Sequence, residues 1–328
     1  MKCTNKLIGI LITAALLVCS GCGADASALN APYDVYQTTQ NVGLSASETT
    51  ASKTYFASDL CVAENVSIGT DETHSEVAEG AGTFNLATNS VVYAKNLFEK
   101  LYPASTTKIL TAYIALKYCD DLDVLVTVSE NAVDQASDSS VCNLKAGDVI
   151  SMRDLLYGLM LRSGNDAAVA IAEYISGDVD SFAALMNQEA VAMGATRSHF
   201  ANPNGLPDEN HYTTVYDMYL IFNKALENET FVNIISAKSY DTVYTNAQGE
   251  SEEHTWENTN QYLAGTTEAP EGFTVVGGKT GTTGDAGYCL VLYSYNAANQ
   301  PIISIVFKAD GRSNLYLLMN EMLAGYAN

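Results

Sequence analysis

The chain has 328 residues, of which 47% are hydrophobic, and its 38 acidic and 16 basic side chains give a formal net charge of −22 at pH 7. That length allows one large domain or two ordinary ones, and the hydrophobic share is sufficient for a sizeable core. So large a negative charge argues against nucleic acid as a partner, because binding to phosphates requires basic patches.

An export signal is predicted at the N-terminus. Two lysines precede an apolar run over residues 7–18, which is too short for a transmembrane helix. The run leads into a segment that resembles a bacterial lipoprotein signal with Cys22 as the lipidated residue, although Cys19 stands where such signals usually carry an aliphatic residue. We therefore expect residues 1–22 to be a signal peptide and Cys22 to anchor the chain to a membrane. Cleavage after the small-residue site Ala24-Asp-Ala26 is the alternative.

A tether is predicted between this signal and the folded part of the chain. Residues 23–58 are rich in Ala, Ser, Thr and Asn and show little apolar periodicity, which is typical of a flexible segment. We expect residues 59–328 to form the folded domain. Its first clear feature is a β-hairpin, because residues 82–86 and 90–94 are strand candidates on either side of a short polar turn.

A helix is predicted to begin near Ser105, just after Pro103, because an apolar-periodic run follows it over residues 109–116. Residues three apart on a helix share a face, so the Ser105 hydroxyl and the Lys108 amine can meet. A serine at a helix N-terminus lies among unpaired backbone N–H groups, which suits a nucleophile whose attack generates an oxyanion. A capping serine beside a surface lysine is the alternative, because Ser-x-x-Lys by itself is a weak motif.

The middle of the chain is predicted to be helical. Ser151-Met-Arg-Asp154 is a capping box ahead of an apolar run, so a helix starts there. The pattern breaks at Arg162-Ser-Gly-Asn165 and resumes as a helix of small residues from Asp166. Further helices are expected over residues 180–194 and after the capping residue Thr214.

The last third of the chain is predicted to be mostly strands, followed by a final helix over residues 313–326. Short links make consecutive strands antiparallel neighbours, and the early hairpin must join the same sheet or stay exposed. We therefore predict an α/β fold of the α+β type, with an antiparallel sheet flanked by helices and a mainly helical subdomain. The late strand candidates are residues 274–279, 288–293 and 301–307.

No metal site or other cofactor is expected from the cysteines and histidines. If Cys22 is acylated, four cysteines remain in the mature chain, without metal-ligand spacing, and the four histidines are scattered. A disulfide between Cys119 and Cys142 is conceivable in an exported protein, and buried free thiols are the alternative. We interpret His199 and His211 as structural residues. The four cysteines are Cys61, Cys119, Cys142 and Cys289.

Two further motifs accompany Ser105 and Lys108. Ser163-Gly-Asn165 lies at the helix break, and Gly278-Lys-Thr-Gly281 follows an apolar strand. The order Ser-x-x-Lys, Ser-Gly-Asn, Lys-Thr-Gly is similar to that of the active-site serine penicillin-recognising enzymes. The resemblance is closest to the low-molecular-weight D-alanyl-D-alanine carboxypeptidases, a family of serine peptidases. It extends over roughly residues 80–326 and is carried by residues 102–111, 155–168, 199–211 and 278–290.

The resemblance implies a β-lactamase/transpeptidase-like fold, with residues 59–328 as a penicillin-binding catalytic domain. It implies removal of the terminal D-alanine from peptidoglycan stem peptides through an acyl-Ser105 intermediate, with β-lactams as covalent inhibitors. Because the chain stops at Asn328, soon after the last predicted helix, we expect no C-terminal β-rich domain of the kind that many family members carry. The expected location is extracytoplasmic, on the outer face of the bacterial cytoplasmic membrane through Cys22, or secreted.

The family's catalytic roles can be carried over to matching residues. Ser105 resembles the nucleophile, and Lys108 resembles the base that takes its proton. An ammonium with an ordinary pKa near 10.4 is a poor base at neutral pH, so burial and a second cation must lower that pKa. Lys279 resembles this second cation and also orients the substrate. Ser163 resembles a relay that returns the proton to the leaving amine.

The remaining carried-over residues bind the substrate. Asn165 resembles the side-chain amide that contacts the substrate backbone, and Gly281 permits that backbone to approach closely. The oxyanion hole would use the backbone N–H groups of Ser105 and Thr282. Thr280 and Arg312 resemble the groups that hold the terminal carboxylate of D-alanine.

Two alternatives belong to other functional classes. A class A β-lactamase carries an extra glutamate in a Glu-x-x-x-Asn loop after the second motif, and no such element occurs here between Ser163 and Lys279. Gly164 also replaces the usual aspartate. A non-catalytic penicillin-sensing or peptidoglycan-binding module is the other alternative, and the intact Ser105 and Lys108 argue against an inactive site.

Overall fold

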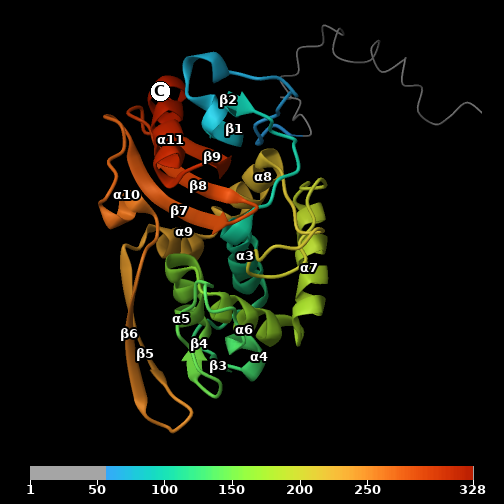
Figure 1. Ribbon diagram of the computed structural model, residues 1–328, viewed down its shortest axis with the longest axis vertical. Coiled ribbons are helices and arrows are strands. Elements are labelled where there is room, and N and C mark those ends of the chain that lie inside the picture. The colour runs from blue at the N-terminus through green and yellow to red at the C-terminus, as the bar shows by residue number, and fades with distance from the viewer. Residues whose placement is uncertain (1–56, 328) are drawn as a thin grey trace, which may run out of the picture. The chain divides into compact units, whose positions relative to one another are not determined.

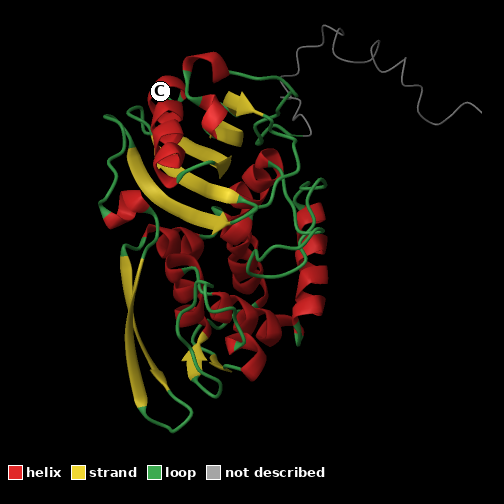
Figure 2. Cartoon of the chain, viewed as in Figure 1, coloured by secondary structure: helices red, strands yellow, loops and turns green. Residues whose placement is uncertain are grey.

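A five-stranded antiparallel sheet lies at one end of the folded part of the chain, and most of the helices lie below it (Figure 1; Figure 2). This computed structural model describes residues 57–327. The predicted signal peptide, with Cys22, and nearly all of the predicted tether lie outside the described residues. Within the described residues, no helix is long and apolar enough to cross a membrane.

The sheet joins strands from both ends of the folded region, as predicted. Its order is β2-β1-β9-β8-β7, so the early hairpin pairs with the last strand through β1, for example Ala81 opposite Val306. The five strands are β1 (Ala78–Asn85), β2 (Ser90–Lys95), β7 (Thr274–Thr283), β8 (Gly287–Tyr295) and β9 (Pro301–Ala309).

Both faces of the sheet are covered, because successive side chains of a strand point to opposite faces. In β8, Leu290 and Leu292 pack with the final helix α11 (Arg312–Tyr326), whereas Cys289 and Val291 belong to the core shared with the other helices. Burial on both faces explains why β8 is a continuous apolar run rather than an alternating one.

The helical region surrounds α3 (Lys108–Tyr118), most of whose residues are buried. The predicted caps are present: Ser151 Oγ accepts from the Asp154 N–H, and Thr214 Oγ1 accepts from the Asp217 N–H. The helix predicted over residues 180–194 begins slightly earlier, because its N-cap is Asp178. The other helices are α4 (Glu130–Val133), α5 (Met152–Tyr157), α6 (Asn165–Ser176), α7 (Val179–Ala192), α8 (Val215–Ala225), α9 (Glu229–Ser236) and α10 (Gln261–Ala264).

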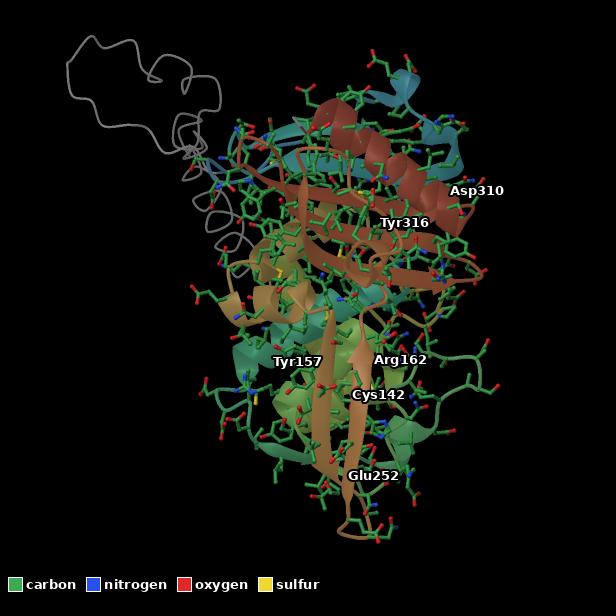
Figure 3. All side chains as sticks on the ribbon, turned by 90° about the vertical axis from the view of Figure 1, so that its left-hand side faces the viewer. Cys142, Tyr157, Arg162, Glu252, Asp310 and Tyr316 are labelled. Atoms are coloured by element: carbon green, nitrogen blue, oxygen red, sulfur yellow. The ribbon has the colours of Figure 1, made fainter. Side chains whose placement is uncertain are left out.

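A second sheet is present. Residues 125–128 are a short strand candidate in the sequence and contain its first strand, and its other strands were not predicted. It has the order β3-β4-β5-β6, and its long hairpin of β5 (Ser239–Thr245) and β6 (Ser251–Glu257) extends away from the first sheet (Figure 3). Many hairpin side chains are polar and exposed, so the strands lack a clear apolar alternation. The short inner strands are β3 (Leu125–Thr127) and β4 (Val149–Ser151).

Aromatic stacking attaches this hairpin to the helical region. The Tyr240 ring lies parallel to the Tyr157 ring at 3.7 Å between centroids, and Tyr240 also stacks with Trp256. This attachment holds the segment that follows β6 beside β7. Thr259 and Gln261 of that segment line the pocket at the functional site. The four described cysteines are buried and free, so the conceivable disulfide between Cys119 and Cys142 is absent.

Candidate active site

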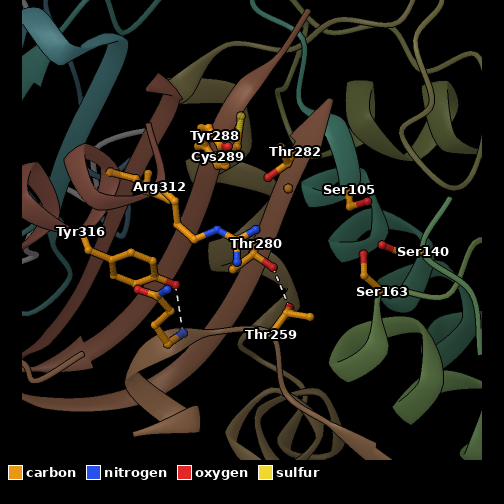
Figure 4. Close-up of a pocket in the computed structure, with 13 residues that line it drawn as sticks. Ser105, Ser140, Ser163, Thr259, Thr280, Thr282, Tyr288, Cys289, Arg312 and Tyr316 are labelled. Carbon is orange, nitrogen blue, oxygen red and sulfur yellow. Dashed lines mark hydrogen bonds between the residues drawn. The ribbon is translucent and has the colours of Figure 1, made fainter. Parts of the chain in front are cut away.

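An open pocket of about 170 Å³ lies between strand β7 and the helical region (Figure 4). Ser105, Ser140 and Ser163 line its helical side, while residues of the sheet, of α11 and of the segment after β6 line the other side. The residues on that second side are Thr259, Gln261, Thr280, Gly281, Thr282, Tyr288, Cys289, Arg312, Leu315 and Tyr316.

Ser105 and Lys108 meet as predicted. Ser105 lies in a 3-10 turn, Ala104–Thr107, that leads directly into α3, so its half-buried side chain stands at the N-terminal end of a long helix. The Oγ atom of Ser105 is 3.0 Å from Nζ of Lys108.

The Lys108 amine is completely buried, and its burial together with the nearby Lys279 favours its neutral form. Its Nζ lies 2.7 Å from Asn165 Oδ1 and 2.8 Å from the backbone oxygen of Asn204. Burial and, to a smaller extent, the Lys279 ammonium lower the pKa of Lys108 well below its ordinary value of 10.5. The two causes anticipated from the sequence therefore both act on this residue.

Lys279 joins the strand to the helical side of the pocket. It projects from β7, is buried, and donates to Ser163 Oγ at 2.9 Å and to the Thr280 backbone oxygen at 2.8 Å. Burial lowers the pKa of Lys279 to about 7. Ser163 Oγ thus accepts a hydrogen bond from Lys279 on one side and faces the open pocket on the other.

Ser163 occupies an unusual backbone position. It follows a π-helical turn, Gly158–Arg162, and has φ 64° and ψ 35°, in the left-handed region that a residue with a side chain rarely adopts. Such π-helical turns and strained residues are concentrated at functional sites. The conformation ends one helix and turns the Ser163 side chain toward the pocket before α6 begins.

Asn165 begins α6 and is buried, with its side-chain oxygen turned to Lys108. Its amide nitrogen is therefore the side-chain atom that remains for a substrate. Asp166 beside it accepts hydrogen bonds from the backbone N–H groups of Cys142 and Leu144. These bonds hold the loop that carries Ser140 against the start of α6.

Gly281 lets strand β7 approach the turn of Ser105. A Cβ atom at Gly281 would lie 3.0 Å from the Ser105 nitrogen and 3.0 Å from the Pro103 oxygen. The backbone of β7 is thus in direct contact with the turn, and the exposed Thr282 follows in the strand.

Arg312 and Thr280 lie at the far side of the pocket from Ser105. Arg312 stands at the start of α11, is exposed, and points its guanidinium group toward Thr280 (Figure 4). Among the described residues, no carboxylate lies within ion-pairing distance of Arg312. The Thr280 hydroxyl lies 2.6 Å from that of Thr259. An unpaired guanidinium beside two hydroxyl groups suits an incoming carboxylate.

Several lining residues were not predicted from the sequence. Ser140, Thr259, Gln261 and Tyr316 lie outside the motifs and the segments that carry the resemblance, and Tyr288 lies in one of those segments without a predicted role. Thr259 follows the unpredicted β5–β6 hairpin, and the Tyr316 hydroxyl accepts from the Gln261 N–H at 2.9 Å. Only the tertiary fold places them together.

Residues 69–311 match a family model described as D-alanyl-D-alanine carboxypeptidase, of the S11 peptidases. The chain belongs to this family. D-alanyl-D-alanine carboxypeptidase DacF of Bacillus subtilis is 34% identical over 253 residues, which are 75% of this chain and 61% of DacF. The corresponding enzyme of Streptomyces sp. strain K15 is 35% identical over 224 residues, or 65% of this chain and 75% of the relative.

Solved structures agree with this assignment. The Streptomyces K15 DD-transpeptidase aligns with a TM-score of 0.69 and 31% identity, over 76% of this chain and 97% of that one. D-alanyl-D-alanine carboxypeptidase DacD of Francisella tularensis aligns with a TM-score of 0.64 and 27% identity, over 80% of this chain and 73% of that one. The predicted β-lactamase/transpeptidase-like fold is therefore confirmed. The chain spans less than two thirds of the length of DacF.

Proposed function

We propose that this protein is a serine-type D-Ala-D-Ala carboxypeptidase that removes the terminal D-alanine from peptidoglycan stem peptides through an acyl-Ser105 intermediate. The proposal depends above all on the 3.0 Å contact between Ser105 Oγ and a buried Lys108 whose neutral form is favoured. A neutral amine beside a hydroxyl is the arrangement that activates a serine nucleophile. Membership of the family supports the substrate class.

In the acylation step, Ser105 Oγ attacks the carbonyl carbon of the peptide bond between the two D-alanines while Lys108 takes the hydroxyl proton. The backbone N–H groups of Ser105 and Thr282 would stabilise the oxyanion of the tetrahedral intermediate. The C–N bond then breaks, and Ser163, held by Lys279, relays to the leaving amine the proton that Lys108 took, so that Lys108 is neutral again. Free D-alanine departs, and water hydrolyses the ester to release the shortened peptide.

The terminal carboxylate of the substrate would bind Arg312 and Thr280, while the Asn165 amide nitrogen and the backbone of β7 bind the peptide itself. The absence of a carboxylate partner for Arg312 among the described residues supports this assignment. A guanidinium fork matches the two oxygens of a carboxylate. β-Lactams, which carry a carboxylate next to a reactive amide, would acylate Ser105 in the same orientation.

The test uses purified full-length protein, a stem peptide ending in D-Ala-D-Ala and a fluorescent penicillin. We expect release of free D-alanine together with a persistent penicillin label, and we expect Ser105→Ala to abolish both. Rapid penicillin hydrolysis without peptide cleavage would indicate a β-lactamase instead. Labelling without either turnover would indicate a penicillin sensor, and D-alanine release by the Ser105→Ala variant would refute the assignment.

We also propose that the protein acts outside the cytoplasm, attached to the membrane through a lipid on Cys22. The support is the sequence of the signal, since Cys22 lies outside the described residues. To test this, radiolabelled fatty acid is fed to cells that produce either the protein or its Cys22→Ala variant. Label and membrane association that depend on Cys22 are expected. A mature N-terminus at Ser27 in a released protein would instead show cleavage at the alternative site.

A further inference from the structure

The segment between α7 and α8 folds directly beneath the catalytic turn. Lys108 Nζ donates to the backbone oxygen of Asn204 at 2.8 Å, and one helical turn later Thr111 Oγ1 donates to the backbone oxygen of Pro203 at 2.6 Å. Gly205 has φ 85°, and a Cβ atom there would lie 1.8 Å from the Ala104 oxygen. The turn of Pro203, Asn204 and Gly205 therefore fits against the turn of Ser105 with no space for a side chain at Gly205.

His211 connects this segment to the turn of Ser105 through two hydrogen bonds of its ring. Its ring is buried, and Nδ1 accepts from the backbone N–H of Ala201 at 3.1 Å. That contact leaves the ring proton on Nε2, which donates to Thr107 Oγ1 at 2.8 Å. Burial lowers the pKa of His211 to about 4, in agreement with a neutral ring. His211 thus joins the segment to the residue immediately before Lys108.

The number of donors on Lys108 has a consequence for Ser105. A neutral amine has two N–H bonds and one lone pair, and its three polar neighbours are Asn165 Oδ1, the Asn204 oxygen and Ser105 Oγ. The backbone oxygen and the amide oxygen can only accept. When each takes one N–H, the lone pair is left for the Ser105 hydroxyl, which then donates.

We propose that the Asn204 carbonyl and His211 are positioning groups for the general base: they direct the Lys108 lone pair at Ser105 Oγ and keep water from the amine. The inference rests on the proposed function, in which Lys108 is that base. His211 acts through Thr107 and the turn, and has no contact with the substrate in this account.

The charged and titratable groups around these residues set the direction of the expected effect. The charges of Lys279, Cys142 and Asp166 influence the pKa of Lys108. Those of Asp208, His199 and Lys108 influence the pKa of His211. The largest influence on Lys108 is its burial. Loosening the turn admits water to the amine, which favours the ammonium, so the acid limb of the pH–rate profile moves to higher pH.

The experiment measures the second-order rate constant for acylation by a fluorescent penicillin between pH 5 and pH 9. His211→Phe keeps a ring against Phe200, which contacts His211 edge to face, but removes both hydrogen bonds. Thr107→Val keeps the side-chain shape and removes the acceptor for Nε2–H. His199→Gln is the matched control, because His199 lies in the same segment and, among the described residues, its exposed ring has one hydrogen bond, to the Asn210 backbone oxygen.

We expect the acylation rate of both test variants to fall by about tenfold at pH 7, because each loses part of the rate contribution of the general base. Part of the lost rate should return at higher pH. The control should retain the wild-type profile. A uniform loss at every pH with an unmoved acid limb would overturn the inference, as would an unchanged profile. If His211→Phe does not fold, Thr107→Val decides. If the wild-type protein is not acylated at all, the proposed function fails, which is a separate result.

Discussion

Lys279 Nζ lies 2.9 Å from Ser163 Oγ, so one hydrogen bond crosses the pocket from strand β7 to the turn before α6. The two residues are 116 positions apart in the chain. Both are buried, and the bond fixes the distance between the sheet and the helical side. Lys279 also lowers the pKa of Lys108 through its charge, so it acts on both motifs of the helical side.

Replacing Lys279 by Ala should move the acid limb of the acylation profile to higher pH. Loss of the ammonium removes a charge that opposes protonation of Lys108, and the space left behind admits water; both effects raise the pKa of Lys108. We expect a fall in acylation rate at pH 7 of about 10²-fold or more. The measurement is the pH dependence of penicillin acylation. Lys308→Ala, at an exposed ion pair with Glu79, is the control and should keep the profile.

Replacing Arg312 by Leu should weaken recognition of the substrate carboxylate. We expect kcat/KM for a D-Ala-D-Ala peptide to fall by about 10- to 100-fold, because a charge-assisted hydrogen bond is lost. A peptide with a C-terminal amide provides the second arm of a double-mutant cycle. Wild type and variant should cleave the amide at similar rates. Equal losses on acid and amide would contradict a direct contact with the carboxylate.

Replacing Asp166 by Ala should destabilise the protein. The buried carboxylate accepts from the backbone N–H groups of Cys142, Leu144 and Ala167, and its removal leaves these donors without a partner. The free energy of unfolding should decrease by about 3 kcal/mol, measured by urea denaturation. Asp180→Ala, at an exposed position near the start of α7, should change it by less than about 0.5 kcal/mol. A neutral Asp166→Ala result would show that the loop does not depend on this carboxylate.

The pH dependence of stability should contain a contribution from His211. Its pKa is about 4 in the folded protein against 6.5 ordinarily, so the unfolded chain binds the proton first as the pH falls. This contribution is fully present above about pH 6.5 and is lost progressively toward pH 4, to a total of about 3 kcal/mol. Urea denaturation at pH 7 and pH 5 should show a smaller pH effect in His211→Phe than in wild type. An equal change in the free energy of unfolding between pH 7 and pH 5 in the two proteins would contradict this contribution from His211.

The sequence by itself determined the family and the local structure of the three motifs. Ser105 and Lys108 are one helical turn apart, so helix geometry alone brings their side chains together. The caps at Ser151 and Thr214 are equally local, because each side chain bonds a backbone N–H three residues later. The late strands were also predictable from local sequence. A strand that is buried on both faces must be apolar throughout, so each of these strands appears as an apolar run.

Only the tertiary structure decided what surrounds Lys108. Burial lowers the pKa of its amine, and the Asn204 backbone oxygen accepts a hydrogen bond from it. A backbone oxygen leaves no trace in the sequence, since every residue has one. Thr259 reaches the pocket because a polar hairpin is fixed by aromatic stacking, and no periodicity marks that hairpin. His211 looks like an ordinary loop histidine until the fold places it under Thr107. Long-range contacts of this kind depend on packing between elements that no local pattern records.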